Sequence, residues 1–233
     1  MSELEAYLYQ RVEQEIRSWA GHDLHDAYII ALYVGFVDDD MRQGMLSGPC
    51  YNTLKHWQQK NGAKVGKWET SEHLYCTKWT LCEPVVEDWG NGDTADPLGV
   101  DLRNKYLADQ SLFITDEENS RFWDHLFRKK GRSSRPGSPG FTPEDSEEYD
   151  QFQEKLTRNG EAFVDVCAAT VQRLHESGAI REVFGHSVPV ILDFSNDMDY
   201  LKVRAWRLMR QSNPDGIAEE WINLHLTNYG LKD

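Results

Sequence analysis

The segment Ala27–Val37 constrains the fold more than any other part of the chain. Its sequence, AYIIALYVGFV, is almost continuously apolar and rich in β-branched and aromatic residues. A strand with one face in water alternates apolar and polar residues, whereas a strand covered on both faces is a continuous apolar run. The run is too short to cross a bilayer as a helix. We therefore predict a central strand, covered on both faces.

Helical spacing precedes this strand. Residues 2–20 carry apolar side chains at intervals of three and four, which places the following on one helix face: Leu4, Leu8, Val12, Ile16 and Trp19. Ser2 and Glu5 have the spacing of a capping box, and Gly21 is a natural stop. A second strand is expected near Met45–Tyr51, followed by a short helix capped by Thr53.

The second half of the chain predicts further helices. Thr115 and Glu118 have capping-box spacing, and Thr142-Pro143-Glu144 combines a cap, a first-turn proline and an early acid. We expect a helix from Pro143 that stops at Gly178 and is kinked or interrupted near Asn159-Gly160. A strand over 188–194, a helix over 198–210 and a last helix from 217 complete the pattern. Residues 62–101 resist assignment, except for strand chemistry over 75–81.

Helices and strands alternate at both ends of the chain, which predicts an α/β or α+β fold. We expect a single domain over 1–233, with a central sheet and helices packed on it. The tract 131–143 is rich in Pro, Gly and Ser. This composition favours a flexible loop within the domain rather than a domain boundary.

The charge of the chain excludes several classes of partner. Its 25 basic and 39 acidic residues give a formal net charge of −14. Broad nucleic-acid binding needs a basic face, and docking on anionic lipid needs the same. We therefore expect neither a nucleic acid nor a membrane as partner, and we expect another protein, of basic character.

Four cysteines are irregularly spaced and form no Cys-x-x-Cys pair, and the N-terminus lacks the features of a signal peptide. These observations favour a reduced, cytoplasmic protein whose cysteines fill the core. The even number of cysteines leaves one disulfide open as an alternative.

Most of the acidic excess falls in two stretches. Residues 1–40 hold nine acids and two basic residues, and residues 83–101 hold six acids and no basic residue. If the fold joins the two stretches, one acidic face results; if they lie apart, the charge serves solubility. We predict that the following residues bind the partner: Asp38, Asp39, Asp40, Glu87, Asp88 and Trp89.

One cluster suggests a metal site. The segment His22-Asp23-Leu24-His25-Asp26 holds two imidazoles and two carboxylates, which are ligands for Zn²⁺ and similar ions. Asp193, at the end of a predicted strand, would complete a site with His22, His25 and Asp26, because functional carboxylates often follow strands in α/β folds. The alternative, which we favour, is a polar connector between the first helix and the first strand.

No catalytic residue is predicted, because the chain has no nucleophile elbow, no phosphate loop and no dinucleotide fingerprint. No cofactor is expected for the same reason.

The order of several landmarks resembles a known family. Tyr28–Tyr33 lies in the first strand, Asn52-Thr53 follows the second, a long helix ends at Gly178, a strand ends at Asp193, and Asn213-Pro214 comes last. This order is similar to an uncharacterised bacterial domain-of-unknown-function family, some of whose members are suspected immunity proteins beside polymorphic toxins. The tract 131–143 departs from it. The resemblance implies a cytoplasmic binding protein that neutralises a partner, and it transfers no catalytic residue.

Two functions follow from these observations. The first is a non-enzymatic, acidic protein-binding module, with neutralisation of a basic toxin as its particular form. The alternative is a metal-dependent hydrolase that uses His22, His25, Asp26 and Asp193.

Overall fold

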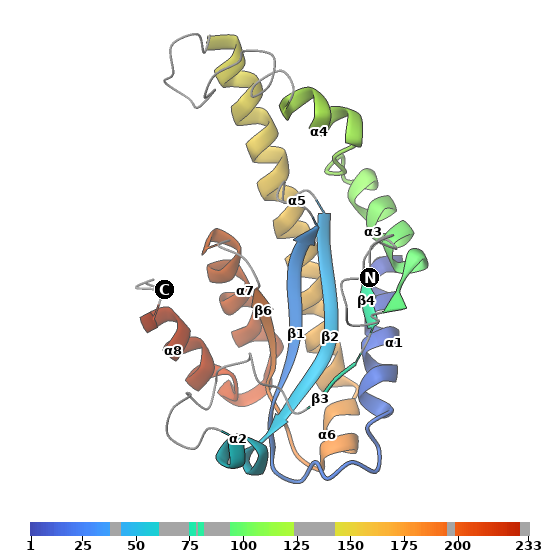
Figure 1. Ribbon diagram of the computed structural model, residues 1–233, viewed down its shortest axis with the longest axis vertical. Coiled ribbons are helices and arrows are strands. Elements are labelled where there is room, and N and C mark those ends of the chain that lie inside the picture. The colour runs from blue at the N-terminus through green and yellow to red at the C-terminus, as the bar shows by residue number, and fades with distance from the viewer. Residues whose placement is uncertain are drawn as a thin grey trace.

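A mixed β-sheet forms the centre of the protein (Figure 1). The computed structural model describes residues 1–37, 43–60, 75–77, 79–81, 94–123, 143–194 and 199–228. The strands are β1 (Ala27–Val37), β2 (Gln43–Thr53), β3 (Tyr75–Cys76), β4 (Trp79–Leu81), β5 (Thr94–Ala95) and β6 (Val190–Phe194). Their order is β5-β4-β2-β1-β6, and β3 pairs with β2. β1 is antiparallel to β2 and parallel to β6, so the α/β prediction is confirmed.

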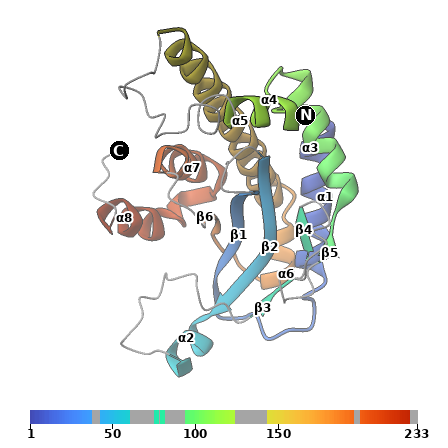
Figure 2. The ribbon, with the colours of Figure 1, turned by 45° about the horizontal axis from the view of Figure 1, so that its top comes forward.

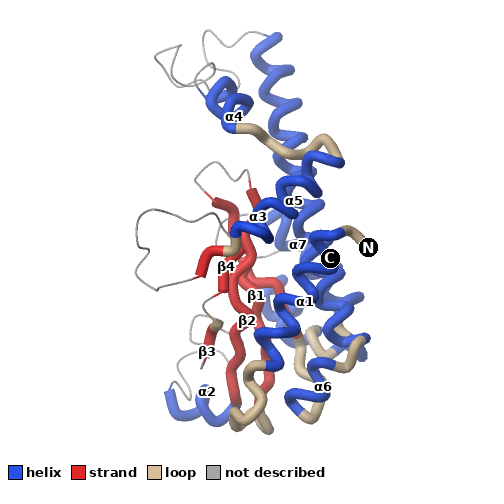
Figure 3. The backbone as a smooth tube through the Cα atoms, turned by 90° about the vertical axis from the view of Figure 1, so that its right-hand side faces the viewer, coloured by secondary structure: helices blue, strands red, loops and turns tan. Residues whose placement is uncertain are grey.

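The helices are α1 (Glu3–Arg17), α2 (Leu54–Lys60), α3 (Pro97–Asp109), α4 (Asp116–Trp123), α5 (Pro143–Glu176), α6 (Ala179–Phe184), α7 (Asp199–Ser212) and α8 (Glu219–Asn228). A 3-10 turn, Pro214–Gly216, separates the last two. Helices α1, α5 and α6 lie on one side of the sheet (Figure 3). α7 and α8 lie beside β6, at the opposite edge of the sheet from β4 and β5 (Figure 2).

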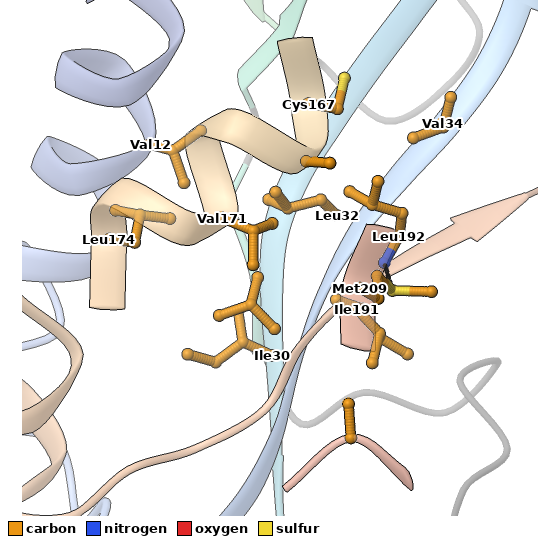
Figure 4. Close-up of a cluster of buried hydrophobic side chains, with 14 of the residues drawn as sticks. Val12, Ile30, Leu32, Val34, Cys167, Val171, Leu174, Ile191, Leu192 and Met209 are labelled. Atoms are coloured by element: carbon orange, nitrogen blue, oxygen red, sulfur yellow. Dashed lines mark hydrogen bonds between the residues drawn. The ribbon is translucent and has the colours of Figure 1, made fainter. Parts of the chain in front are cut away.

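β1 has the central position that its composition predicts. All residues from Ala27 to Leu32 are buried, although successive side chains point to opposite faces of a strand. The side chains of Ile30 and Leu32 lie beside Val171 of α5 (Figure 4). The buried residues of both ends of the chain form one core.

A bulge interrupts the pairing of β1 with β2. Ala31 pairs with Cys50, but Tyr33 pairs with Ser47, so β2 contains one extra residue here. Gly48 has a φ of +87°, a conformation that favours glycine. The bulge accommodates Pro49, which has no N–H for a regular ladder and whose carbonyl accepts a hydrogen bond from Thr77 N at 3.1 Å.

The long helix α5 corrects one expectation. It runs without interruption from Pro143 to Glu176, so the predicted break near Asn159-Gly160 is wrong. Asn159 is fully buried, and its Nδ2 donates to the carbonyl of Leu112 at 3.0 Å. Packing of this kind overrides the weak helical preference of Asn and Gly. The tract 131–142 lies outside the described residues.

The N-termini of α4 and α3 are both marked by capping residues in the sequence. At α4, Thr115 N donates to the Glu118 carboxylate at 2.9 Å and Glu118 N donates to Thr115 Oγ1 at 3.1 Å, which confirms the capping box. Helix α3 was not predicted. Its signal was present in Asp96-Pro97, a cap followed by a first-turn proline, and Asp96 accepts a hydrogen bond from Gly99 N at 3.0 Å.

Gly44 tests the contact between β2 and α5. A Cβ at this position would lie 2.2 Å from Cδ1 of Phe163, a fully buried ring. We expect Gly44→Ala to lower the free energy of unfolding by about 2 kcal/mol, because the close-packed core must shift to make room. Urea unfolding measures this cost. In a Phe163→Leu background the cost should fall, and an equal cost in both backgrounds would contradict the assignment of the clash.

Candidate binding site

The predicted partner-binding residues all lie outside the described part of the chain. They are Asp38, Asp39, Asp40, Glu87, Asp88 and Trp89. Whether the two acidic stretches form one face therefore stays a prediction.

The predicted metal ligands are not brought together. His22, His25 and Asp26 precede β1, whereas Asp193 pairs with Tyr33, further along the same strand. At about 3.3 Å per residue, roughly 20 Å of strand separates Asp26 from Asp193. The four-residue site is therefore wrong in its inclusion of Asp193. Among the described residues, no group of three or more His, Cys, Asp or Glu side chains is placed to hold a metal ion.

Each member of the His22–Asp26 segment has a local partner. His22 Nδ1 and the Tyr51 hydroxyl are joined by a hydrogen bond of 2.9 Å, and His25 forms an ion pair with Asp23. The hydrogen bond from His25 lowers the pKa of the Asp23 carboxyl, and the same bond raises the pKa of His25. Asp26 Oδ2 accepts a hydrogen bond from Lys55 N at 2.7 Å, at the start of α2. These contacts are typical of a polar connector.

His22 belongs to a group of packed rings, which we call the aromatic cluster: Trp19, His22, Tyr51, Tyr75 and Phe184. It lies where the end of α1, β2, β3 and α6 meet, at the lower end of the molecule in Figure 1. Trp19 is fully buried, and its Nε1 has no hydrogen-bond partner. Tyr75 is 41% exposed and His22 is also exposed, so the cluster reaches from the core to the surface.

The exposed ring of Tyr75 is held from three sides. It stacks on Tyr51 with ring centroids 5.8 Å apart, and it meets His22 edge-on at 5.3 Å and Trp19 edge-on at 6.1 Å. Burial raises the pKa of the Tyr51 hydroxyl. A large ring held in place in this way can bind a partner at a small cost in conformational entropy.

A disulfide anchors the cluster. Cys50 of β2 and Cys76 of β3 are directly opposite in the strand register and are bonded to each other. The expectation of reduced cysteines is wrong for this pair, which forms the disulfide that the even number of cysteines left open. Cys167 and Cys50 are buried, as expected of core cysteines, whereas Cys76 is exposed. Cys82 lies outside the described residues. The sequence spacing could not reveal the pair, because the cysteines meet only once β3 aligns with β2.

A second group of rings lies between α7 and α8. His225 stacks on Trp221 with centroids 3.9 Å apart, and Trp206 meets both rings. His225 Nδ1 donates to the Trp221 carbonyl at 2.9 Å. Burial lowers the pKa of His225, with a smaller opposing effect from Asp193 and a lowering effect from Lys202. Asp193 is therefore a neighbour of this group rather than of the His22–Asp26 segment.

Buried histidines predict a pH dependence of stability. Burial is the main cause of the lowered pKa of both His175 and His225, whereas an unfolded histidine titrates at about pH 6.5. Below that pH the unfolded chain binds more protons than the native protein. The contribution of these two histidines to the free energy of unfolding is therefore fully present above about pH 6.5 and is lost as the pH falls. We expect urea unfolding midpoints to decrease from about pH 7 to about pH 5.

The variants His175→Gln and His225→Gln should each reduce this pH dependence. His25, whose pKa is raised by its ion pair with Asp23, has the opposite sense between about pH 7 and about pH 5. It is exposed, however, and solvent screening keeps its contribution small. An unchanged pH dependence in both variants would contradict the assignment.

No family model matches this chain, and no curated protein or solved structure matches it either. Among the described residues, no helix combines the length and apolar character that crossing a membrane requires.

Proposed function

We propose that this chain is an acidic, non-enzymatic protein-binding module, and that its partner is a basic protein. Neutralisation of a basic toxin in the cytoplasm is the particular form that we propose. The observation that carries the proposal is the exposed, rigidly backed ring of Tyr75 in the aromatic cluster. Binding energy in protein interfaces concentrates in a few residues, and tyrosine is enriched among them.

The chemistry around this ring suits a basic partner. The faces of Tyr rings attract the cationic groups of Arg and Lys. Asp23 follows His22 directly, and its carboxylate side chain is 68% exposed. A charge of −14 on the whole chain also accelerates association with a cationic protein.

The test is a titration against a basic protein encoded beside this chain, by calorimetry at low and at physiological salt. We expect a complex at micromolar or lower concentration that weakens as salt increases. Tyr75→Ala should weaken it by about tenfold or more, as expected for the loss of an interface anchor.

Leu224→Ala provides the matched control. Leu224 is similarly exposed, at 38%, but lies on α8 beside β6, away from the aromatic cluster. Its replacement should leave the affinity unchanged. The proposal fails if no complex forms at low salt, or if the Tyr75 and Leu224 variants bind as tightly as the parent protein.

A further inference from the structure

We propose that the Cys50–Cys76 disulfide is a thiol-exchange site that controls the aromatic cluster. A dithiol reductant opens the bond, and opening releases β3 together with Tyr75. The release of β3 does not depend on the proposed function, whereas the resulting loss of partner binding rests on it.

The two cysteines differ in exposure. Cys50 is buried, with 1% of its surface exposed, and it packs beneath the bulge at Gly48. Cys76 is exposed at the surface. An incoming thiolate therefore reaches the sulfur of Cys76 first. Exposed disulfides of this kind are the ones that exchange readily.

The exchange balances as a two-electron reduction. The thiolate of the dithiol forms a bond to Cys76 Sγ, the bond between Cys76 and Cys50 breaks, and Cys50 Sγ leaves and takes up a proton. The second thiol of the reductant then attacks its own mixed disulfide and releases Cys76 as a thiol. The protein disulfide is reduced to two thiols, and the dithiol is oxidised to a disulfide.

Without this bond, β3 is held to the sheet by only a short pairing with β2 among the described residues. The strand has two residues, paired as Cys76 with Cys50 and Tyr75 with Tyr51, and Thr77 N donates to Pro49 O at 3.1 Å. A pairing this short is marginal in water. Among the described residues, the other contacts of this strand are those of the Tyr75 ring with Tyr51, His22 and Trp19. Release of the strand therefore also removes the Tyr75 ring from the aromatic cluster.

The position of the bond argues against a general structural role. Most of the core consists of residues from both ends of the chain, with Trp79 and Leu81 from its middle, and Ile30, Leu32 and Val171 are fully buried without contact to the disulfide. A chain of 233 residues buries enough surface to fold without a covalent link. Cys167 does not compete in the exchange, because it is fully buried and burial raises the pKa of its thiol.

The experiment uses the full-length oxidised protein under native conditions, with dithiothreitol as the dithiol. Alkylation and intact mass count the thiols that appear, and hydrogen exchange follows the amides of Thr77 and of the β1–β6 pair. We expect the disulfide to open without denaturant. Exchange at Thr77 should then accelerate by about tenfold or more, while the amides of Ile30 and Leu32 remain protected. Cys50→Ser/Cys76→Ser should reproduce the reduced state, and Cys167→Ala should behave as the parent protein.

Two outcomes would overturn the inference. In the first, the bond resists dithiothreitol until the protein is denatured, or Thr77 stays protected after reduction. In the second, the β1–β6 amides lose protection together with Thr77, which would make the disulfide a structural link for the whole fold. Partner binding is measured separately: if reduction releases β3 but Tyr75→Ala does not weaken the complex, the proposed function fails and the exchange site stands.

Discussion

Replacement of Asn213 by alanine is expected to lower the free energy of unfolding by about 4 kcal/mol, since each buried polar group left without a partner costs about 1–3 kcal/mol. Asn213 is buried beside the first residue of β6. Its Oδ1 accepts hydrogen bonds from Val190 N at 2.8 Å and from His175 Nε2 at 3.0 Å. Its Nδ2 donates to Val190 O at 2.9 Å and to Met209 O at 3.0 Å. The side chain therefore binds the N–H and the carbonyl of Val190, as a paired strand would do.

Two further variants separate the contributions of this amide. Asn213→Asp keeps an acceptor for Val190 N and His175 but loses the donor to Val190 O, so its cost should be intermediate. Asn223→Ala removes an exposed asparagine from α8 and should change stability by less than about 0.5 kcal/mol. Urea unfolding at neutral pH gives all three values. Equal stability of the Asn213→Ala and Asn223→Ala proteins would show that Asn213 does not support β6.

Asp96→Ala should have an effect of similar size, about 4 kcal/mol, which combines a lost helix cap with two orphaned donors. Both oxygens of Asp96 lie 2.8 Å from the Tyr7 hydroxyl, Oδ2 accepts from Trp79 Nε1 at 2.8 Å, and Oδ1 accepts from Gly99 N. One carboxylate thus joins α1, β4 and the start of α3. Its removal leaves the donors of Tyr7 and Trp79 without their partner.

The Tyr7 hydroxyl provides a second measurement at this site. Burial, followed by the hydrogen bond to Asp96, raises the pKa of Tyr7 to about 12. In the Asp96→Ala protein this pKa should fall, because the part due to the carboxylate is lost while the burial remains. Spectroscopic titration of tyrosine detects the change. Asp101→Ala, an exposed aspartate of the same helix, is the matched control and should alter neither stability nor the titration of Tyr7. A Tyr7 pKa that is the same in both variants would refute the coupling.

Local patterns predicted elements whose determinants lie close together in the chain. The strand Ala27–Val37 has the predicted bounds, because a continuous apolar run excludes a half-exposed strand. The capping box at Thr115 and Glu118 and the start of α5 at Pro143 were predicted for the same reason: donor, acceptor and proline lie within one helical turn. Where a local signal was weak, as at Asn159-Gly160, a distant contact decided the structure and the prediction was wrong.

Local and periodic patterns thus predict the class of fold, the central strand and most of the helices. Which side chains meet depends instead on how whole strands and helices pack. Asp96 contacts a tyrosine 89 residues away, Cys76 bonds to a cysteine 26 residues away, and Asn213 contacts a strand 23 residues away. None of these separations corresponds to the periodicity of a helix or a strand, so no sequence pattern reveals the pairs. The partners come together through the packing of whole strands and helices. The aromatic cluster arises in the same way. Its rings come from four segments that have no common sequence pattern and meet only because the segments pack together.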